Sequence, residues 1–176
     1  PDIGKTILEK LQEFCETGTV ELIESEKNNP IHIFSEVYGI GPKKAQELVT
    51  LGITSISHLR SRQNDVLNAT QRIGLHYYED ILKRIPRAEI DAYKAVIENT
   101  VDHLSSTFKN LKFEIVGSYR RGAETSGDID VILSCDNPAA LSNAFVAYLV
   151  SQRVILEVLS QGPSKALVIA KLFSAD

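Results

Sequence analysis

The sequence contains no methionine, only two cysteines and no long apolar run. Because even an initiator methionine is missing, we expect the chain to be a piece of a longer protein. Cys15 and Cys135 have neither CxxC spacing nor a disulfide framework, so we expect them to act as small apolar residues in a reducing compartment. No stretch approaches the ~20 apolar residues of a membrane-spanning helix, and no secretory signal is visible. The sequence therefore predicts no membrane partner.

Acidic residues slightly outnumber basic ones, giving a formal net charge of −4 over 176 residues. This balance argues against a large nucleic-acid-binding surface. The charge is unevenly distributed, however, because residues 1–27 carry seven acids and three bases, whereas residues 28–90 carry eight bases and six acids. Any phosphate-binding face therefore has to be local. The four histidines are scattered without metal-ligand spacing, and we assign them no catalytic role.

Residues 116–133 carry the most informative pattern in the chain. They predict the end of one strand, a loop of glycines, hydroxyls and paired arginines, and then a second strand on which apolar residues alternate with Asp128 and Asp130. Alternation places both carboxylates on one face, roughly 7 Å apart at the backbone. Two carboxylates this close repel each other unless a cation lies between them, and their oxygens favour Mg²⁺ or Mn²⁺.

The loop before these acids has the groups that a triphosphate requires. Gly117 and Ser118 allow close backbone approach and offer donors, and Arg121 can bind phosphate oxygens. Ser126 and Gly127 can form a second concavity of N–H groups. Arg120 and Arg121 should point to opposite sides, so one is expected to form a structural pair. A surface hairpin with a polar loop is the plainer alternative, but the joint pattern is hard to explain by packing and favours nucleotidyl transfer.

The first half of the chain predicts helices. Residues 1–26 are expected to begin with a helix that has Ile7, Leu8, Leu11 and Phe14 as its apolar stripe and ends at Gly18. Residues 31–38 predict a short helix that ends in Gly39-Ile40-Gly41-Pro42, and Pro42 suits the first position of the next helix. Helix, Gly-Ile-Gly, helix is the helix-hairpin-helix pattern.

In such a hairpin the glycines bring backbone N–H groups up to a phosphate, so it binds a nucleic-acid backbone without contacting bases. Lys43 and Lys44 add local positive charge. An αα-hairpin with a glycine turn occurs in many proteins, which is the structural alternative. A partial repeat favours DNA binding: Asp2-Ile3-Gly4 and its helix mirror the second copy, although Asp2 stands where a glycine belongs.

The composition shifts near residues 88–110, from helical hairpins to a mixed unit. We expect helices over residues 70–83 and from there to about residue 108, then a strand over residues 111–116 that precedes the acidic strand. A helix should follow Pro138, and residues 154–159 and 166–172 predict a hairpin. The predicted fold class is α+β, with antiparallel strands in the second half.

Four stretches together resemble a family X DNA polymerase, the polymerase beta-like repair enzymes. They are Gly39-Ile40-Gly41-Pro42, residues 71–80, residues 83–87, and residues 117–130 with Gly-Ser-Tyr-Arg-Arg-Gly and Ser-Gly-Asp-Ile-Asp. Their order and spacing agree across nearly the whole chain. The resemblance implies the end of a lyase-like domain at residues 1–27, a helix-hairpin-helix subdomain at 28–88, and a truncated nucleotidyltransferase palm with a mostly antiparallel sheet at 89–176.

The resemblance also implies roles for single residues. Asp128 and Asp130 would ligate two Mg²⁺ or Mn²⁺ ions about 3.5–4 Å apart. The triphosphate would be bound by Arg84, Gly117, Ser118, Arg121, Ser126 and Gly127. The hairpin residues Gly39, Gly41, Lys43 and Lys44 would bind DNA, and carbonyls near Ser35, Val37 and Ile40 would bind Na⁺ or K⁺. Lys10 would form the Schiff base of a 5′-deoxyribose-phosphate lyase; a solvated lysine on an acidic helix is the alternative.

The implied activity is DNA-directed DNA synthesis that fills gaps during repair. The implied partners are gapped or nicked DNA, a dNTP and repair factors such as a ligase, for a monomer in the nucleus. The family's third aspartate and thumb-like segment are expected beyond this chain, with Asp176 in the loop that precedes that strand. Without them the fragment is expected to be incomplete. Two alternatives remain: another nucleotidyltransferase, including a terminal transferase, and a non-catalytic DNA-binding scaffold.

Overall fold

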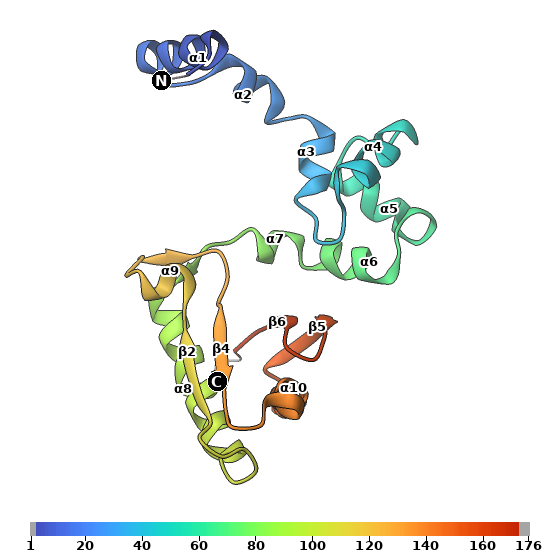
Figure 1. Ribbon diagram of the computed structural model, residues 1–176. Helices are drawn as coiled ribbons and strands as arrows, with labels where there is room; N and C mark the ends of the chain where they lie inside the picture. The colour runs from blue at the N-terminus through green and yellow to red at the C-terminus, as the bar shows by residue number, and fades with distance from the viewer. Residues whose placement is uncertain (1–2, 173–176) are drawn as a thin grey trace. The chain divides into compact units, whose positions relative to one another are not determined.

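The computed structural model describes residues 3–172, and the chain forms two compact units, Pro1–Tyr78 and Glu79–Asp176 (Figure 1). Asp2 and Asp176, which the sequence analysis singled out, lie outside the described residues. In the described part of the chain, no helix is both long and apolar enough to cross a membrane.

Among its described residues, the first unit has helices as its only regular elements. Its elements are α1 (Lys5–Thr17), α2 (Glu21–Glu26), α3 (Pro30–Ser35), α4 (Pro42–Thr50), α5 (Ile56–Val66) and α6 (Ala69–His76). Gly18 ends α1 as predicted, with a left-handed φ of 74° and an N–H that donates to the Phe14 carbonyl at 2.8 Å. The predicted apolar stripe of α1 is present but exposed, between 46% for Leu11 and 55% for Phe14.

The core of the first unit lies around the helical hairpin. Phe34 from α3, Ala45 and Leu48 from α4, Leu59 from α5 and Leu75 from α6 are all buried in one cluster. The helix starts follow from the sequence: Asn29 accepts a hydrogen bond from the Ile31 N–H, and Pro30 and Pro42 occupy the first turns of their helices. The hairpin that Gly39-Ile40-Gly41-Pro42 predicts is therefore present.

The predicted helix over residues 70–83 is interrupted. It ends at His76, Tyr77 leaves the helical conformation, and α7 (Tyr78–Ile81) follows. Two tertiary contacts lie on either side of Tyr77. Gly74 packs so closely on the Tyr38 backbone that a Cβ would overlap the Tyr38 carbonyl oxygen, and the Tyr78 hydroxyl donates to Glu36 at 2.8 Å. Helical periodicity alone contains no sign of either contact.

The second unit is mixed, as predicted. Its elements are β1 (Ile85–Pro86), α8 (Arg87–Leu104), β2 (Lys112–Ile115), α9 (Gly117–Arg120), β3 (Thr125–Ser126), β4 (Val131–Ser134), a 3-10 turn (Pro138–Ala140), α10 (Leu141–Ser151), β5 (Ile155–Gln161) and β6 (Ala166–Ala170). Among the described residues the strands form antiparallel pairs, β1 with β3, β2 with β4 and β5 with β6. The α+β class is confirmed.

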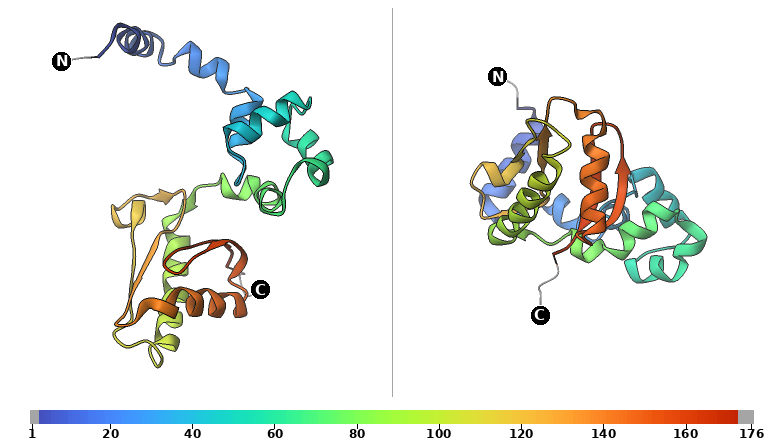
Figure 2. Two further views of the ribbon diagram at one scale, coloured as in Figure 1. Left: turned by 45° about the vertical axis from the view of Figure 1, so that its right-hand side comes forward. Right: turned by 90° about the horizontal axis from the view of Figure 1, so that it is seen from below.

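Helices α8 and α10 supply much of the core of the second unit. Helix α8 packs along β2, and α10 packs against α8 and β5 (Figures 1 and 2). Ile90 and Ile97 of α8, Ile115 of β2, Phe145 of α10 and Ile155 of β5 are buried in one cluster. This core supports the inner face of the β2–β4 pair, whose opposite face is exposed.

Two details differ from the expected strand-loop-strand pattern at residues 116–133. The regular strand begins only at Val131, so Asp128 and Asp130 directly precede it rather than lie on it. The alternation persists nevertheless, because Ile129, Val131 and Leu133 are partly buried while the two aspartates are exposed. Residues 117–120 form the short helix α9 instead of an open loop, since Gly117 takes a φ of +64° that turns the chain sharply after β2.

Candidate active site

Asp130 and Gly117 are in direct contact. The Val116 N–H donates to the Asp130 carbonyl at 2.9 Å, which continues the β2–β4 pairing past the regular strands. A Cβ built on Gly117 would lie 2.5 Å from the Asp130 Oδ2 atom. The sequence pattern predicted that Gly117 allows close approach to a phosphate. In the structure, the group that it approaches is the Asp130 carboxylate.

The two carboxylates suit a divalent cation. Within residues 3–172, neither the Asp128 nor the Asp130 carboxylate has a hydrogen-bond or ion-pair partner, and both residues are exposed. In this part of the chain, no three or more His, Cys, Asp or Glu side chains are grouped so that they could hold a metal ion by themselves. Mg²⁺ commonly binds one or two carboxylates and takes its remaining ligands from water and substrate phosphates. The two carboxylates therefore fit Mg²⁺ or Mn²⁺, whose other ligands would be water and substrate phosphates.

Ser118 and Ser126 form a hydroxyl pair. The Ser118 Oγ donates to the Ser126 Oγ at 2.8 Å, joining α9 to β3. The Ser126 residue is fully buried, whereas Ser118 is half-buried. The Ser126 side chain is therefore placed to orient Ser118, and only Ser118 presents its hydroxyl near the surface.

Arg84 lies beside the same strand. Its Nε donates to the Thr125 Oγ1 at 3.1 Å and its Nη2 to the Thr125 carbonyl at 2.6 Å. A Cβ on Gly127 would lie 3.7 Å from the Arg84 Nη1 atom. The antiparallel pairing of Ile85 with Ser126 fixes this register. The structure thus brings Arg84, Ser126 and Gly127 together.

Arg120 and Arg121 are both exposed, and neither guanidinium has a hydrogen-bond or ion-pair partner among the described residues. The expectation that one of them forms a structural pair is therefore not met in this part of the chain. A different arginine, Arg87 at the start of α8, makes the structural contacts. Its role was missed because its partners lie more than thirty residues away in sequence.

Arg87 contacts the loop through several groups. Its N–H donates to the Glu124 carbonyl at 2.9 Å, and its Nη1 donates to the carbonyls of Tyr119 at 2.9 Å and Ala123 at 3.4 Å. The guanidinium also lies 4.1 Å from the centre of the Tyr119 ring. The Tyr119 hydroxyl donates to Asp91 at 2.7 Å, and this hydrogen bond is the main cause that raises the pKa of Tyr119 above its ordinary value.

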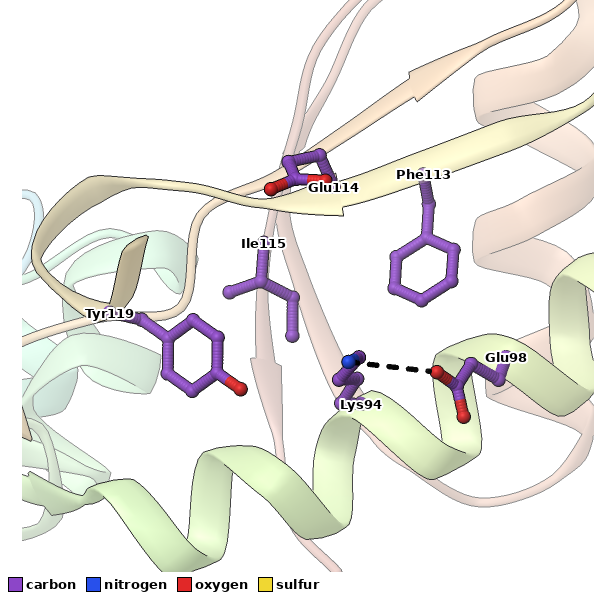
Figure 3. Close-up of a pocket in the computed structure, with 6 residues that line it drawn as sticks. All are labelled: Lys94, Glu98, Phe113, Glu114, Ile115 and Tyr119. Carbon is purple, nitrogen blue, oxygen red and sulfur yellow. Dashed lines mark ion pairs between the residues drawn. The ribbon is translucent and has the colours of Figure 1, made fainter. Parts of the chain in front are cut away.

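A shallow cavity of about 250 Å³ lies between α8 and β2, with the Tyr119 ring at one end (Figure 3). Residues from both elements line it: Lys94, Glu98, Phe113, Glu114, Ile115 and Tyr119. Lys94 and Glu98 face each other across 3.9 Å. No residue predicted to bind metal, nucleotide or DNA is among them.

The helical hairpin presents its predicted DNA-binding residues in the first unit. Gly39 has a φ of +83°, and its carbonyl accepts a hydrogen bond from the Gln71 Nε2 at 3.0 Å. Gly41 caps α4, so the first N–H groups of that helix are left without intrahelical acceptors. Lys43 is exposed, whereas the Lys44 ammonium lies 2.8 Å from Glu47. Gln71 was not predicted as part of this site.

The remaining predicted residues also lie in the first unit. Ser35 ends α3, Val37 and Ile40 are buried in the turn, and the Ile40 N–H donates to the Val37 carbonyl at 2.9 Å. Lys10 is exposed on α1 and has no ion-pair or hydrogen-bond partner within residues 3–172. The structure thus divides the predicted residues between two units, with the divalent-metal and triphosphate candidates in the second and the monovalent-cation, DNA-binding and lyase candidates in the first.

Two family models match the chain. Residues 32–82 match the fingers domain of DNA polymerase lambda, and residues 84–174, slightly more than half of the chain, match the DNA polymerase beta palm. A nucleotidyltransferase palm is thus the class of protein that the second unit defines. The chain belongs to the family of DNA polymerases beta and lambda.

Individual relatives cover most of the chain. It is 33% identical over 138 residues to DNA polymerase lambda of Arabidopsis thaliana and 34% identical over 137 residues to that of Rattus norvegicus, each alignment covering 76% of this chain. It is 31% identical over 131 residues, 74% of the chain, to DNA nucleotidylexotransferase of Oncorhynchus mykiss. These alignments cover 25%, 23% and 26% of the relatives, so the chain spans about a quarter of their length.

Proposed function

We propose that the chain is part of a family X DNA polymerase that adds a dNMP to a primer 3′-hydroxyl, copying a template to fill gaps in DNA. The observation that carries this proposal is the contact between the Asp130 carboxylate and Gly117, directly beside Ser118. A carboxylate pair and an array of phosphate donors in one place suit two-metal nucleotidyl transfer. The family to which the chain belongs supports the same reaction.

Each residue of the second unit has a defined task in this proposal. Asp128 and Asp130 would ligate the divalent ions, which when bound supply Lewis-acid activation of the 3′-hydroxyl and neutralise the triphosphate. Ser118, Arg121 and the Gly127 N–H would bind phosphate oxygens. Arg84, which Thr125 orients, would add a second guanidinium from the side of β3. Ser126 would act on the phosphates through Ser118, because its own side chain is buried.

The first unit would bind the DNA. The N–H groups at the start of α4, beside Gly39 and Gly41, would bind backbone phosphates, and Lys43 and Lys44 would add charge. Carbonyls of Ser35, Val37 and Ile40 would bind a monovalent cation. We propose domain limits at residues 27 and 88, and a monomer that acts on gapped or nicked DNA in the nucleus with repair factors such as a ligase.

The first experiment is primer extension on a single-nucleotide gap with Mg²⁺, using the full-length protein and its Asp130→Ala variant. Loss of a metal ligand removes several kcal/mol of transition-state stabilisation, so we expect a roughly thousandfold lower rate. Asp102→Ala, which removes an exposed acid from the same unit, is the control and should extend normally. Equal activity of the Asp130→Ala variant and the wild type would contradict the proposed metal site.

The same assay separates the alternatives. Extension that ignores the template base would indicate a terminal transferase, like the nucleotidylexotransferase among the relatives. Tight binding to gapped DNA without extension would indicate a scaffold. We also propose the lyase activity that the resemblance implies for Lys10, and borohydride trapping on a 5′-deoxyribose phosphate tests it. Lys10→Ala should abolish the covalent adduct, whereas Lys5→Ala, the control on the same helix, should retain it.

A further inference from the structure

Residues 117–124 form a loop that cannot maintain its shape alone. Helix α9 has only four residues, and its first residue Gly117 and the following Gly122 adopt left-handed φ values of +64° and +85°. After the helix, the Gly122 N–H donates to the Tyr119 carbonyl at 3.0 Å and the Ala123 N–H to the Ser118 carbonyl at 3.1 Å. A single helical turn is unstable without tertiary support. Something outside the loop therefore has to fix the direction of Ser118 and Arg121.

Arg87 supplies that support from α8. Its guanidinium donates to the carbonyls of Tyr119 and Ala123 and lies over the Tyr119 ring, and its backbone N–H donates to the Glu124 carbonyl. These carbonyls lie on both sides of Arg121. Tyr119 is also bound at its other end, because its hydroxyl donates to Asp91, one helical turn after Arg87. The loop is thereby fixed to the first two turns of α8.

The charge of Arg87 remains directed at the loop. Within residues 3–172 the guanidinium has no carboxylate partner, so its donors are bound to carbonyl oxygens and its face to an aromatic ring. A planar guanidinium can donate to two carbonyls and stack at the same time, which a lysine ammonium cannot do. We infer that Arg87 is a positioning residue that holds residues 118–124 in the shape that presents Ser118 and Arg121 to the triphosphate of the incoming nucleotide. The inference rests on the proposed function.

The test compares three variants of the full-length protein with the wild type in single-nucleotide gap filling. Arg87→Ala should raise the KM for the dNTP by roughly tenfold to a hundredfold, the effect of losing charge-assisted hydrogen bonds, and leave the Kd for gapped DNA unchanged. Arg87→Lys keeps the charge but loses the planar set of donors and the stacking on the Tyr119 ring, so it should show most of this effect. Lys94→Ala, which removes a cation two turns further along α8, should leave both constants unchanged.

Two further readouts separate positioning from general destabilisation. Added guanidinium ions should lower the KM of the Arg87→Ala variant toward the wild-type value, whereas they should not improve the Lys94→Ala variant. Amide hydrogen exchange at Gly122 and Ala123 should be faster in Arg87→Ala, since their hydrogen bonds close the loop that Arg87 supports. Exchange within α10, on the far side of the core, should not change.

The outcomes distinguish this inference from the proposed function. If the wild type extends primers and Arg87→Ala and Arg87→Lys leave both the KM and the exchange of Gly122 and Ala123 unchanged, the positioning role is wrong. A lower melting temperature with an unchanged KM, or a raised KM that guanidinium does not lower, would also overturn it. If the wild type does not extend primers, but Arg87→Ala weakens binding of Mg²⁺–dNTP and speeds the exchange, the proposed function fails and the positioning role stands.

Discussion

The glycine turn at Gly39 and the loop from Gly117 to Gly122 are supported by different kinds of donor. At the helical hairpin, the Gly39 carbonyl accepts from Gln71, a neutral amide that is 8% exposed and also caps α6 with Asn68. In the second unit, the carbonyls of Tyr119 and Ala123 accept from the charged Arg87. One turn is thus fixed from inside an apolar core, and the other is fixed by a cation near the surface.

This difference suits what each turn is proposed to bind. A neutral buried donor adds no charge to the hairpin, so its phosphate contacts depend on backbone N–H groups and nearby lysines. A guanidinium both shapes the phosphate loop and adds positive potential where several negative charges would gather. We therefore expect the geometry of the hairpin to be insensitive to salt, and the loop to respond to ionic strength, because screening weakens charged interactions near the surface.

The largest effect on stability is expected at the hairpin, for Gly74→Ala. The added methyl would overlap the Tyr38 carbonyl, and neither backbone can retreat within the packed unit. We expect a loss of roughly 3 kcal/mol in the free energy of unfolding of the first unit, measured by denaturant titration. Gly4→Ala, which meets no atom within 4 Å, is the control and should cost only a few tenths of that value. A mild effect of Gly74→Ala would mean that α6 does not brace the hairpin.

The next effect should appear in the loop, for Gly117→Ala compared with Gly122→Ala. Both variants place alanine at a left-handed φ, which costs about 1–2 kcal/mol of stability in each case. Only at residue 117 would the new methyl meet a carboxylate, that of Asp130, whereas Gly122 has no atom within 4 Å. Displacing a catalytic group by about 1 Å can cost a hundredfold. Primer extension should therefore fall about a hundredfold further in Gly117→Ala than in Gly122→Ala; equal losses would show that backbone strain is the only cause.

The smallest expected effect tests the neutral support directly, through Gln71→Ala. The variant loses the hydrogen bonds to the Gly39 carbonyl and the Asn68 N–H, so the first unit should lose about 2 kcal/mol. Faster amide exchange in α4 and α6 would localise the change. The loss should be the same at low and high salt, since no ion pair is removed. A loss of stability that shrinks as salt is added would show that the support from Gln71 depends on charge, as that from Arg87 is expected to do.

Short-range chemistry in the sequence predicted much of this structure. The Gly39 turn, Pro42 at the start of α4, Gly18 after α1 and the alternation through Ile129 and Val131 all depend on residues a few positions apart. The resemblance assigned Arg84, Ser126 and Gly127 to one triphosphate site. The pairing of β1 with β3 brings these three residues together. Those features come from local backbone preference or from a motif that the chain shares with its family.

The unpredicted features depend on contacts between distant residues. Gly117 lies against Asp130, Arg87 donates across more than thirty residues to the loop, and Tyr77 interrupts a helix near the contact of Gly74 with Tyr38. None of these pairings leaves a periodicity or a spacing in the sequence. The expected structural role for Arg120 or Arg121 was placed on the wrong arginine for the same reason.

The hydroxyl pair has a consequence for the order of events at the site. A serine hydroxyl carries one proton, and the Ser118 proton is donated to Ser126 across 2.8 Å. For Ser118 to donate to a phosphate, the bond between the two oxygens has to reverse, so that Ser126 becomes the donor and Ser118 the acceptor. Only two hydroxyl rotations are needed, and no heavy atom has to move. The buried serine would then turn its own O–H toward Ser118 when the anion arrives, and no proton would pass between the two oxygens.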